Sequence, residues 1–188
     1  MRKLWITCFI FLLLLPALES TVAADLKEGF SGIKWGTDIS ELNNFEKIGS
    51  SERVSYYLNP EKLHTIHNID IPYVVYAFFD EKFFAVFAVI ETFEVYSQLK
   101  SRLMSQFGNP ETTLTAKHEQ TIYRWKQKDI KIKLKLRGVD DQMKLAFYYR
   151  PLSKEVNESR VEELPDKSYR FFPIEKGKKW ERIPLLEF

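Results

Sequence analysis

The chain has 188 residues, with 28 Lys and Arg against 26 Asp and Glu, and a single Cys. A net charge of +2 points to no general class of partner. One Cys excludes a small scaffold held by disulfides. A chain of this length can bury the core of one ordinary domain without cross-links.

The first 24 residues have the three parts of a secretory signal peptide. Two basic residues precede an uncharged apolar run of 12 residues, Leu4 to Leu15, and Val22-Ala23-Ala24 offers small side chains to a signal peptidase. The run is shorter than the ~20 residues of a membrane-spanning helix. We expect cleavage after Ala24, a periplasmic or secreted protein, and loss of the only cysteine, Cys8. Anchoring in the inner membrane by uncleaved residues 4–15 is the alternative.

The first half of the mature chain predicts mainly strands. Residues 29–36 predict a short strand and a short helix after it, for which Thr37 is a plausible N-cap. Residues 53–58 predict a Tyr-rich strand, whereas the polar residues 59–70 are expected to be irregular. Two strands, 71–79 and 83–92, are apolar on both faces, as is typical of strands in the middle of a sheet.

Residues 94–107 predict the longest helix. Apolar side chains recur every four residues, at Val95, Leu99, Leu103 and Phe107. Gly108 lies where a helix C-cap is expected, and Pro110 prevents continuation.

The second half predicts three further strands, over residues 121–126, 129–137 and 142–149. The fold class is therefore α+β, with antiparallel meander sheets packed with one short and one long helix. The order β-α-βββ-α-βββ leaves open a duplicated αβββ unit. We divide the chain into a signal peptide (1–24), the α+β domain (25–150) and a C-terminal tail interrupted by prolines (151–188), with one short helix over 153–164.

Two short sequence segments resemble those of known protein families. These are Gly32-Ile33-Lys34-Trp35-Gly36-Thr37 and the Phe-Gly-Asn-Pro that ends the long helix. The chain resembles small exported bacterial proteins of unknown function. Its second half also resembles loosely the small lipoproteins of outer-membrane assembly (SmpA/BamE type) and the β-lactamase-inhibitor type. The resemblance implies a helix packed on a meander and no catalytic residues. The chain differs from these lipoproteins because its sequence lacks their lipidation site.

No residues are assigned to catalysis, to a cofactor or to a metal. His64-x-x-His67 is the best metal candidate, but no Cys or carboxylate pair completes a ligand set. The acid pairs Asp80-Glu81 and Asp140-Asp141 fall at expected turns, where Asp is common for conformational reasons. Phosphate-binding loops and nucleophile elbows are absent from the sequence.

Charge placement is the one unusual feature. Residues 120–150 hold nine Lys and Arg against three Asp. Strand alternation gathers most of these cations on one face of the sheet. We call this the basic face and assign it seven residues: Arg124, Lys126, Lys131, Lys133, Lys135, Arg137 and Lys144.

Anionic groups are the expected partners of the basic face. They belong either to an external partner or to the tail, where Glu155, Glu158, Glu162 and Glu163 fall on the expected short helix. An ordinary solvated surface is the third reading. An external partner would be a lipid headgroup, a cell-wall polymer or another protein, whereas nucleic acid does not suit an exported chain.

The absence of catalytic motifs favours a non-catalytic binding or assembly-accessory protein of the cell envelope over an enzyme. The alternative is a small envelope hydrolase whose site is assembled from dispersed residues such as His64, His67 and Glu91.

Overall fold

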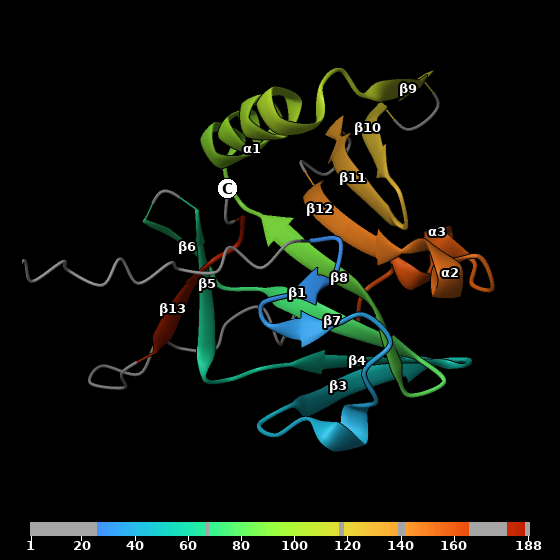
Figure 1. The fold of residues 1–188 in the computed structure, drawn as a ribbon. Helices are drawn as coiled ribbons and strands as arrows, with labels where there is room; N and C mark the ends of the chain where they lie inside the picture. The colour runs from blue at the N-terminus through green and yellow to red at the C-terminus, as the bar shows by residue number, and fades with distance from the viewer. Residues whose placement is uncertain (1–25, 67, 117–118, 139–141, 166–179, 187–188) are drawn as a thin grey trace, which may run out of the picture.

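A large antiparallel sheet forms the centre of the molecule in a computed structural model, which describes residues 26–66, 68–116, 119–138, 142–165 and 180–186. The sheet has eight strands in the order β3-β4-β7-β8-β12-β11-β10-β9 (Figure 1). The strands are β3 (Glu46–Ser51), β4 (Val54–Leu58), β7 (Val74–Phe79), β8 (Lys82–Ile90), β9 (Glu111–Thr115), β10 (Gln120–Gln127), β11 (Ile130–Arg137) and β12 (Gln142–Tyr149). The architecture is mainly antiparallel sheet with few helices, which agrees with the α+β class.

The two strands predicted to be central are central. All six residues of β7 and eight of the nine residues of β8 are buried. Strands β8 and β12 pair where two runs of four strands meet, one run from each half of the chain. Apolar side chains on both faces suit this position, because layers of the fold cover both sides of the sheet.

Part of one face of the sheet is covered by α1 (Phe93–Phe107), which lies over one end of the sheet in Figure 1. The side chain of Thr92 caps the helix start by accepting from the backbone N–H of Val95 at 3.3 Å. Gly108 ends the helix with φ of 77°, a conformation that favours glycine. The predicted apolar stripe is turned inward, since Leu99 and Leu103 are fully buried.

The N-terminal segment differs from the expected single strand. It forms a hairpin of β1 (Gly29–Phe30) and β2 (Ile33–Lys34). Its two-residue turn uses left-handed conformations at Ser31 (φ 50°) and Gly32 (φ 79°), which match the twist of antiparallel strands. The short helix after it is one 3₁₀ turn, η1 (Ile39–Glu41), and its N-cap is Asp38, one residue after the expected Thr37.

The expectation of an irregular segment is wrong. Residues 59–70 contain β5 (Lys62–Ile66) and the start of β6 (Ile69–Ile71), which pair with each other. The burial of β5 was hidden in the sequence, because the buried His64 and the half-buried Thr65 are both polar residue types. Strands β3 and β9 were also missed. Each forms an edge of the large sheet, where exposed polar residues are normal.

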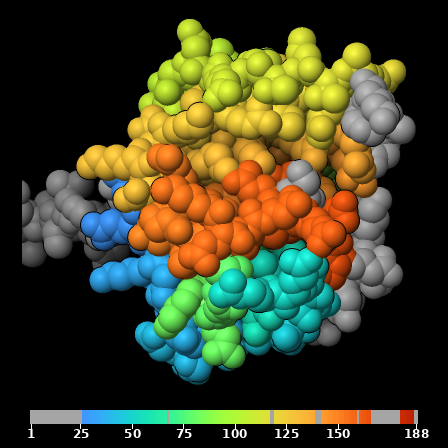
Figure 2. All heavy atoms as spheres, turned by 90° about the vertical axis from the view of Figure 1, so that its right-hand side faces the viewer, coloured from blue at the N-terminus to red at the C-terminus, as the bar shows by residue number. Residues whose placement is uncertain are grey.

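The other face is covered by the first part of the tail. It forms α2 (Arg150–Ser153) and α3 (Glu158–Val161), two short helices instead of the single helix expected over 153–164. Pro151 lies in the first turn of α2, the helical position that tolerates proline. Figure 2 shows the orange segment after β12 spread over the middle of this face. The hydroxyl of Tyr56 donates to the carbonyl oxygen of Val161 at 3.1 Å and fixes the end of α3 on β4.

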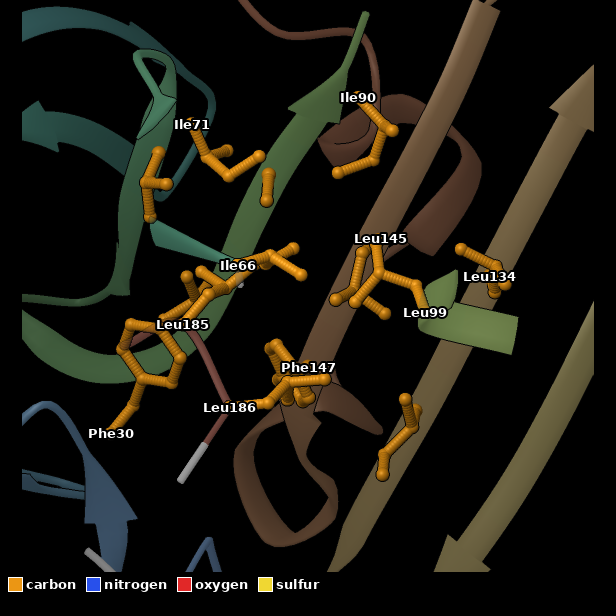
Figure 3. Packing of buried hydrophobic residues seen from close by; sticks show 14 of the residues in the cluster. Phe30, Ile66, Ile71, Ile90, Leu99, Leu134, Leu145, Phe147, Leu185 and Leu186 are labelled. Carbon is orange, nitrogen blue, oxygen red and sulfur yellow. The ribbon is translucent and has the colours of Figure 1, made fainter. Parts of the chain in front are cut away.

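The last described residues return to the core. Strand β13 (Glu181–Pro184) pairs in parallel with β5 and completes a three-stranded sheet with β6. Leu185 and Leu186 follow it and are 2% and 4% exposed. Figure 3 shows them among the buried side chains of Phe30, Ile66 and Phe147. Parts of the tail therefore dock on the domain. Among the described residues, no helix combines the length and apolar character needed to cross a membrane.

Candidate functional site: the basic face and its acidic cover

Strand register brings the predicted cations of the basic face together. Lys131 lies directly opposite Lys126, and Lys133 lies opposite Arg124. On the other side of β11, Lys135 lies opposite Lys144. Like charges in such pairs repel and destabilise a sheet. The face therefore needs anions, and the structure shows which residues supply some of them.

Two glutamates of the tail lie across the face. Glu158 forms ion pairs with Lys131 and Lys133, the second at 2.6 Å between Nζ and Oε2. Glu162 forms ion pairs with Lys133 at 2.8 Å and with Lys135 at 3.3 Å. Glu162 follows α3 directly, and its backbone N–H donates to the carbonyl oxygen of Glu158 at 3.0 Å, so the two side chains are one helical turn apart and project from the same side.

Glu162 is the most enclosed of these acids, with 8% of the residue exposed. Its Oε1 also accepts from the hydroxyl of Tyr148 at 2.6 Å, and its backbone carbonyl accepts from Lys144 Nζ at 2.9 Å. Burial alone raises the pKa of Glu162. The charge of Lys133, the hydrogen bonds from Lys133 and Tyr148, and the charge of Lys135 outweigh burial, and the pKa lies below its usual value. The carboxyl is thus ionised at neutral pH.

Two groups near Glu162, Lys131 and Tyr148, also have shifted pKa values. Burial and the nearby Lys133 lower the pKa of Lys131 to about 8, although the negative charge of Glu162 opposes this shift. The pKa of Tyr148 is raised well above its usual value, first by burial and then by the charge of Glu162. Tyr148 therefore stays protonated and acts as a hydrogen-bond donor.

The predicted acidic cover is confirmed for two of its four residues. Glu158 and Glu162 contact the face, whereas Glu155 and Glu163 are exposed. Side chains of Lys131, Lys133 and Lys135 are only 16%, 12% and 23% exposed. Three of the seven assigned residues therefore serve mainly as partners of the tail.

Two cations on β10 lie beside the covered region. Lys126 has a 59% exposed side chain and pairs with Glu111 of β9 at 3.2 Å. Arg124 is half-buried and donates to the hydroxyl of Thr113. Arg137 and Lys144 are also half-buried on the same face. Five neighbouring cations of β10 and β11 thus meet three carboxylates within the described part of the chain. The cations are Arg124, Lys126, Lys131, Lys133 and Lys135, and the carboxylates belong to Glu111, Glu158 and Glu162.

The dispersed residues of the alternative enzyme do not share one environment. His64 is 2% exposed, whereas Glu91 is exposed at the end of β8. His67, His118 and the pair Asp140-Asp141 lie outside the described residues. Within the described ranges, no group of three or more His, Cys, Asp or Glu side chains comes together as a metal site would require.

The other predicted acid pair has a structural role. Asp80 and Glu81 form the β7–β8 turn, with φ of 45° and 65°. The Asp80 carboxylate accepts from Arg53, and this hydrogen bond lowers the pKa of Asp80. The pair therefore shapes a hairpin and holds a neighbouring strand.

Comparisons of the chain with models of protein families, with curated proteins and with solved structures found no match. The argument for function consequently stands on the residues and contacts described above.

Proposed function

We propose that this chain is an exported, non-catalytic binding protein of the cell envelope, and that its basic face binds anionic groups of an envelope component. The carrying observation is that five neighbouring cations, from Arg124 and Lys126 on β10 and from the three lysines of β11, meet three carboxylates in the described part of the chain. Arg124 and Lys126 lie on the β10 side of the face, and the side chain of Lys126 is largely exposed. Phosphate and carboxylate are the chemistries that such cations attract.

Export is part of the proposal. The first 24 residues lie outside the described part of the chain, and their sequence pattern supports cleavage. Mass spectrometry of the protein recovered from the envelope should find Asp25 as the first residue. Recovery of the full-length chain from the cytoplasm would contradict export, and recovery from the inner membrane would support an uncleaved anchor.

The order of the strands supports an internal duplication, in which each unit has four strands, one more than the αβββ unit expected from the sequence. Strands β3-β4-β7-β8 and β9-β10-β11-β12 run outward from the central β8–β12 pair in mirrored order. A helical segment, η1 or α1, precedes each run. In this proposal, the β5–β6 hairpin is an insertion in the first unit.

Vesicle and cell-wall sedimentation tests the binding function directly. The protein starting at Asp25 is mixed with phosphatidylglycerol vesicles, with phosphatidylcholine vesicles and with purified cell-wall fragments at low and physiological salt. We expect the protein to bind the phosphatidylglycerol vesicles or the cell-wall fragments. This binding should weaken steeply as salt rises, because dissolved ions screen the attraction between exposed charges. Vesicle binding identifies a lipid headgroup, and binding to fragments alone identifies a cell-wall polymer.

The double variant Arg124→Gln with Lys126→Gln should weaken this binding. Its matched control is Lys34→Gln with Lys47→Gln, which removes the same charge from exposed positions on β2 and β3. An equal loss of binding in the two double variants would show that any positive charge on the protein contributes, and would refute the basic face as the binding site. Failure of the parent protein to bind any anionic arm at low salt would refute the function itself.

A further inference from the structure

Four cations gather around the turn between β10 and β11, at one end of the basic face. Arg124 and Lys126 lie on β10, and Lys131 lies directly opposite Lys126 on β11. Arg150 follows β12, and its backbone N–H donates to the carbonyl oxygen of Asp129 in the turn at 2.6 Å. Figure 1 shows this turn beside α2, which begins at Arg150. We name Arg124, Lys126, Lys131 and Arg150 the turn cluster.

The two arginines of the turn cluster are each held by a neutral acceptor. Arg124 donates from Nη1 to the hydroxyl of Thr113 at 2.5 Å, and Arg150 donates from Nη1 to the carbonyl oxygen of Lys128 at 2.7 Å. Within the described ranges, neither guanidinium forms an ion pair with a carboxylate. A guanidinium has five N–H donors, and both arginines are only half-buried. Each arginine therefore retains N–H donors for an acceptor from outside the chain.

Two carboxylates pair with the turn cluster in the described part of the chain. Glu111 lies opposite Arg124 on the neighbouring strand, but its ion pair is with Lys126. Glu158 pairs with Lys131 through one oxygen, while its other oxygen pairs with a lysine outside the cluster. The turn itself adds one charge of each sign. Four cations less two carboxylates leave an excess of at least two positive charges.

Both arginines act on Lys131, which places the three cations in one neighbourhood. Arg124 is the diagonal neighbour of Lys131 across the β10–β11 pair, a position about 7–8 Å away in antiparallel strands. Burial and the charge of Lys133 lower the pKa of Lys131 to about 8, with smaller contributions from the charges of Arg124 and Arg150. The cations of the cluster therefore repel one another, and a bound anion would relieve that repulsion.

The number of donors and the excess charge together favour one class of anion. A phosphate monoester presents three acceptor oxygens and close to two negative charges at neutral pH, whereas a carboxylate presents two oxygens and one charge. Guanidinium groups bind phosphate through paired N–H···O bonds, and an ammonium adds a point charge. We propose that the turn cluster binds a phosphate monoester, held by Arg124 and Arg150 with Lys131 between them. Because the cluster is part of the basic face, this proposal rests on the function proposed above.

Titration with methyl phosphate tests the site on the protein starting at Asp25. The matched probes are dimethyl phosphate, a diester with one charge and two free oxygens, and acetate, all at pH 7.5 and constant ionic strength. Binding is followed by the ¹⁵N and ¹H NMR signals of the arginine Nε–H groups. We expect methyl phosphate to shift the signals of Arg124 and Arg150 in a saturable way. Dimethyl phosphate and acetate should bind about tenfold more weakly, since each lacks an oxygen and a charge.

Variants of Arg150 test the residue that the basic face did not include. Arg150→Gln should weaken methyl phosphate binding by about tenfold or more, the usual effect of losing hydrogen bonds to a charged group. Arg150→Lys keeps the charge without the paired donors, so its loss should be smaller. The control is Lys47→Gln, at an exposed position on β3, which should leave the affinity unchanged.

Dihexanoyl-phosphatidic acid and inorganic phosphate distinguish the two sources of such a group. Tighter binding of the soluble lipid identifies a lipid headgroup, and tighter binding of inorganic phosphate identifies the free ion. Either order supports the phosphate chemistry of the site.

Three results would overturn the phosphate site. These are no saturable shift of Arg124 and Arg150 up to about 20 mM methyl phosphate, equal affinity for methyl phosphate and dimethyl phosphate, or unchanged affinity in Arg150→Gln. The signals of the parent protein decide the question even if a variant does not fold. Vesicle or cell-wall binding by a protein that fails to bind methyl phosphate would overturn this site and leave the proposed function standing. Methyl phosphate binding without vesicle or cell-wall binding would support the site and refute the envelope partner.

Discussion

Replacing Glu162 by Gln should destabilise the protein markedly. The substitution keeps the size of the side chain and removes the charge that Lys133, Lys135 and Tyr148 share. Removing one partner of a buried ion pair typically costs about 3–5 kcal/mol. Because Lys133 keeps Glu158 at 2.6 Å, we expect the lower end, about 3 kcal/mol.

Urea unfolding at pH 7 measures this loss. With a slope of about 2 kcal/mol per molar urea, a loss of about 3 kcal/mol moves the midpoint down by about 1.5 M. The matched control is Glu163→Gln, one residue further and exposed, which should change the free energy of unfolding by less than about 0.5 kcal/mol. Equal effects of the two substitutions would refute the buried network as a source of stability.

The pH dependence gives an independent check on the same carboxylate. The pKa of Glu162 is lowered in the folded protein, so its contribution is fully present above the unfolded value near 4.5 and is lost as the pH falls through the folded value. The stability difference between the parent protein and Glu162→Gln should therefore shrink below about pH 4.5. A constant difference from pH 7 to pH 3 would contradict this linkage.

Three further predictions concern buried side chains. Leu99→Ala, at a fully buried position of α1, should cost about 2–5 kcal/mol in urea unfolding, and a cost below about 1 kcal/mol would disprove tight packing there. Leu185→Ala should cost a similar amount because its side chain is 2% exposed, whereas Leu114→Ala, 74% exposed on β9, should be nearly neutral; matching effects would show that the C-terminal strand is not docked. His64 has its pKa lowered to about 3 by burial and by Lys62, so stability should fall as the pH drops from about 6.5 toward about 3, by up to about 1.4 kcal/mol per pH unit. The variant His64→Leu should lack that slope, and a slope of equal size in the variant would assign it to other groups.

Local patterns were enough to predict the central strands and the long helix. In β7 and β8 the residues are apolar on both faces, a pattern typical of strands that are covered on both sides. The stripe of α1, together with Thr92 and Gly108, marks a helix and its ends within one short segment. Strict alternation in β11 likewise placed three lysines on one face before any partner strand was known.

Edge strands and buried polar residues could not be predicted from local sequence patterns. Strand β9 exposes most of its side chains, so its sequence carries no apolar signal. His64 is a polar residue type, yet it is buried, and Tyr76 of β7, twelve residues further along the chain, provides a partner for its Nε2. Only the folded arrangement supplies such partners, since they come from distant parts of the chain.

Strand alternation alone predicts a face of like charges, and the composition of the tail predicts an acidic segment that can meet it. Which carboxylates reach the lysines depends on the folded arrangement. Glu158 and Glu162 point to the sheet, while Glu155 and Glu163 remain exposed, because the chain turns between two short helices instead of continuing as one. The direction of a side chain on a helix follows from where the helix begins, and that point is fixed here by packing against β4 and β12, through Tyr56 and Tyr148. Charge composition is a local property, whereas neutralisation depends on distances across the fold.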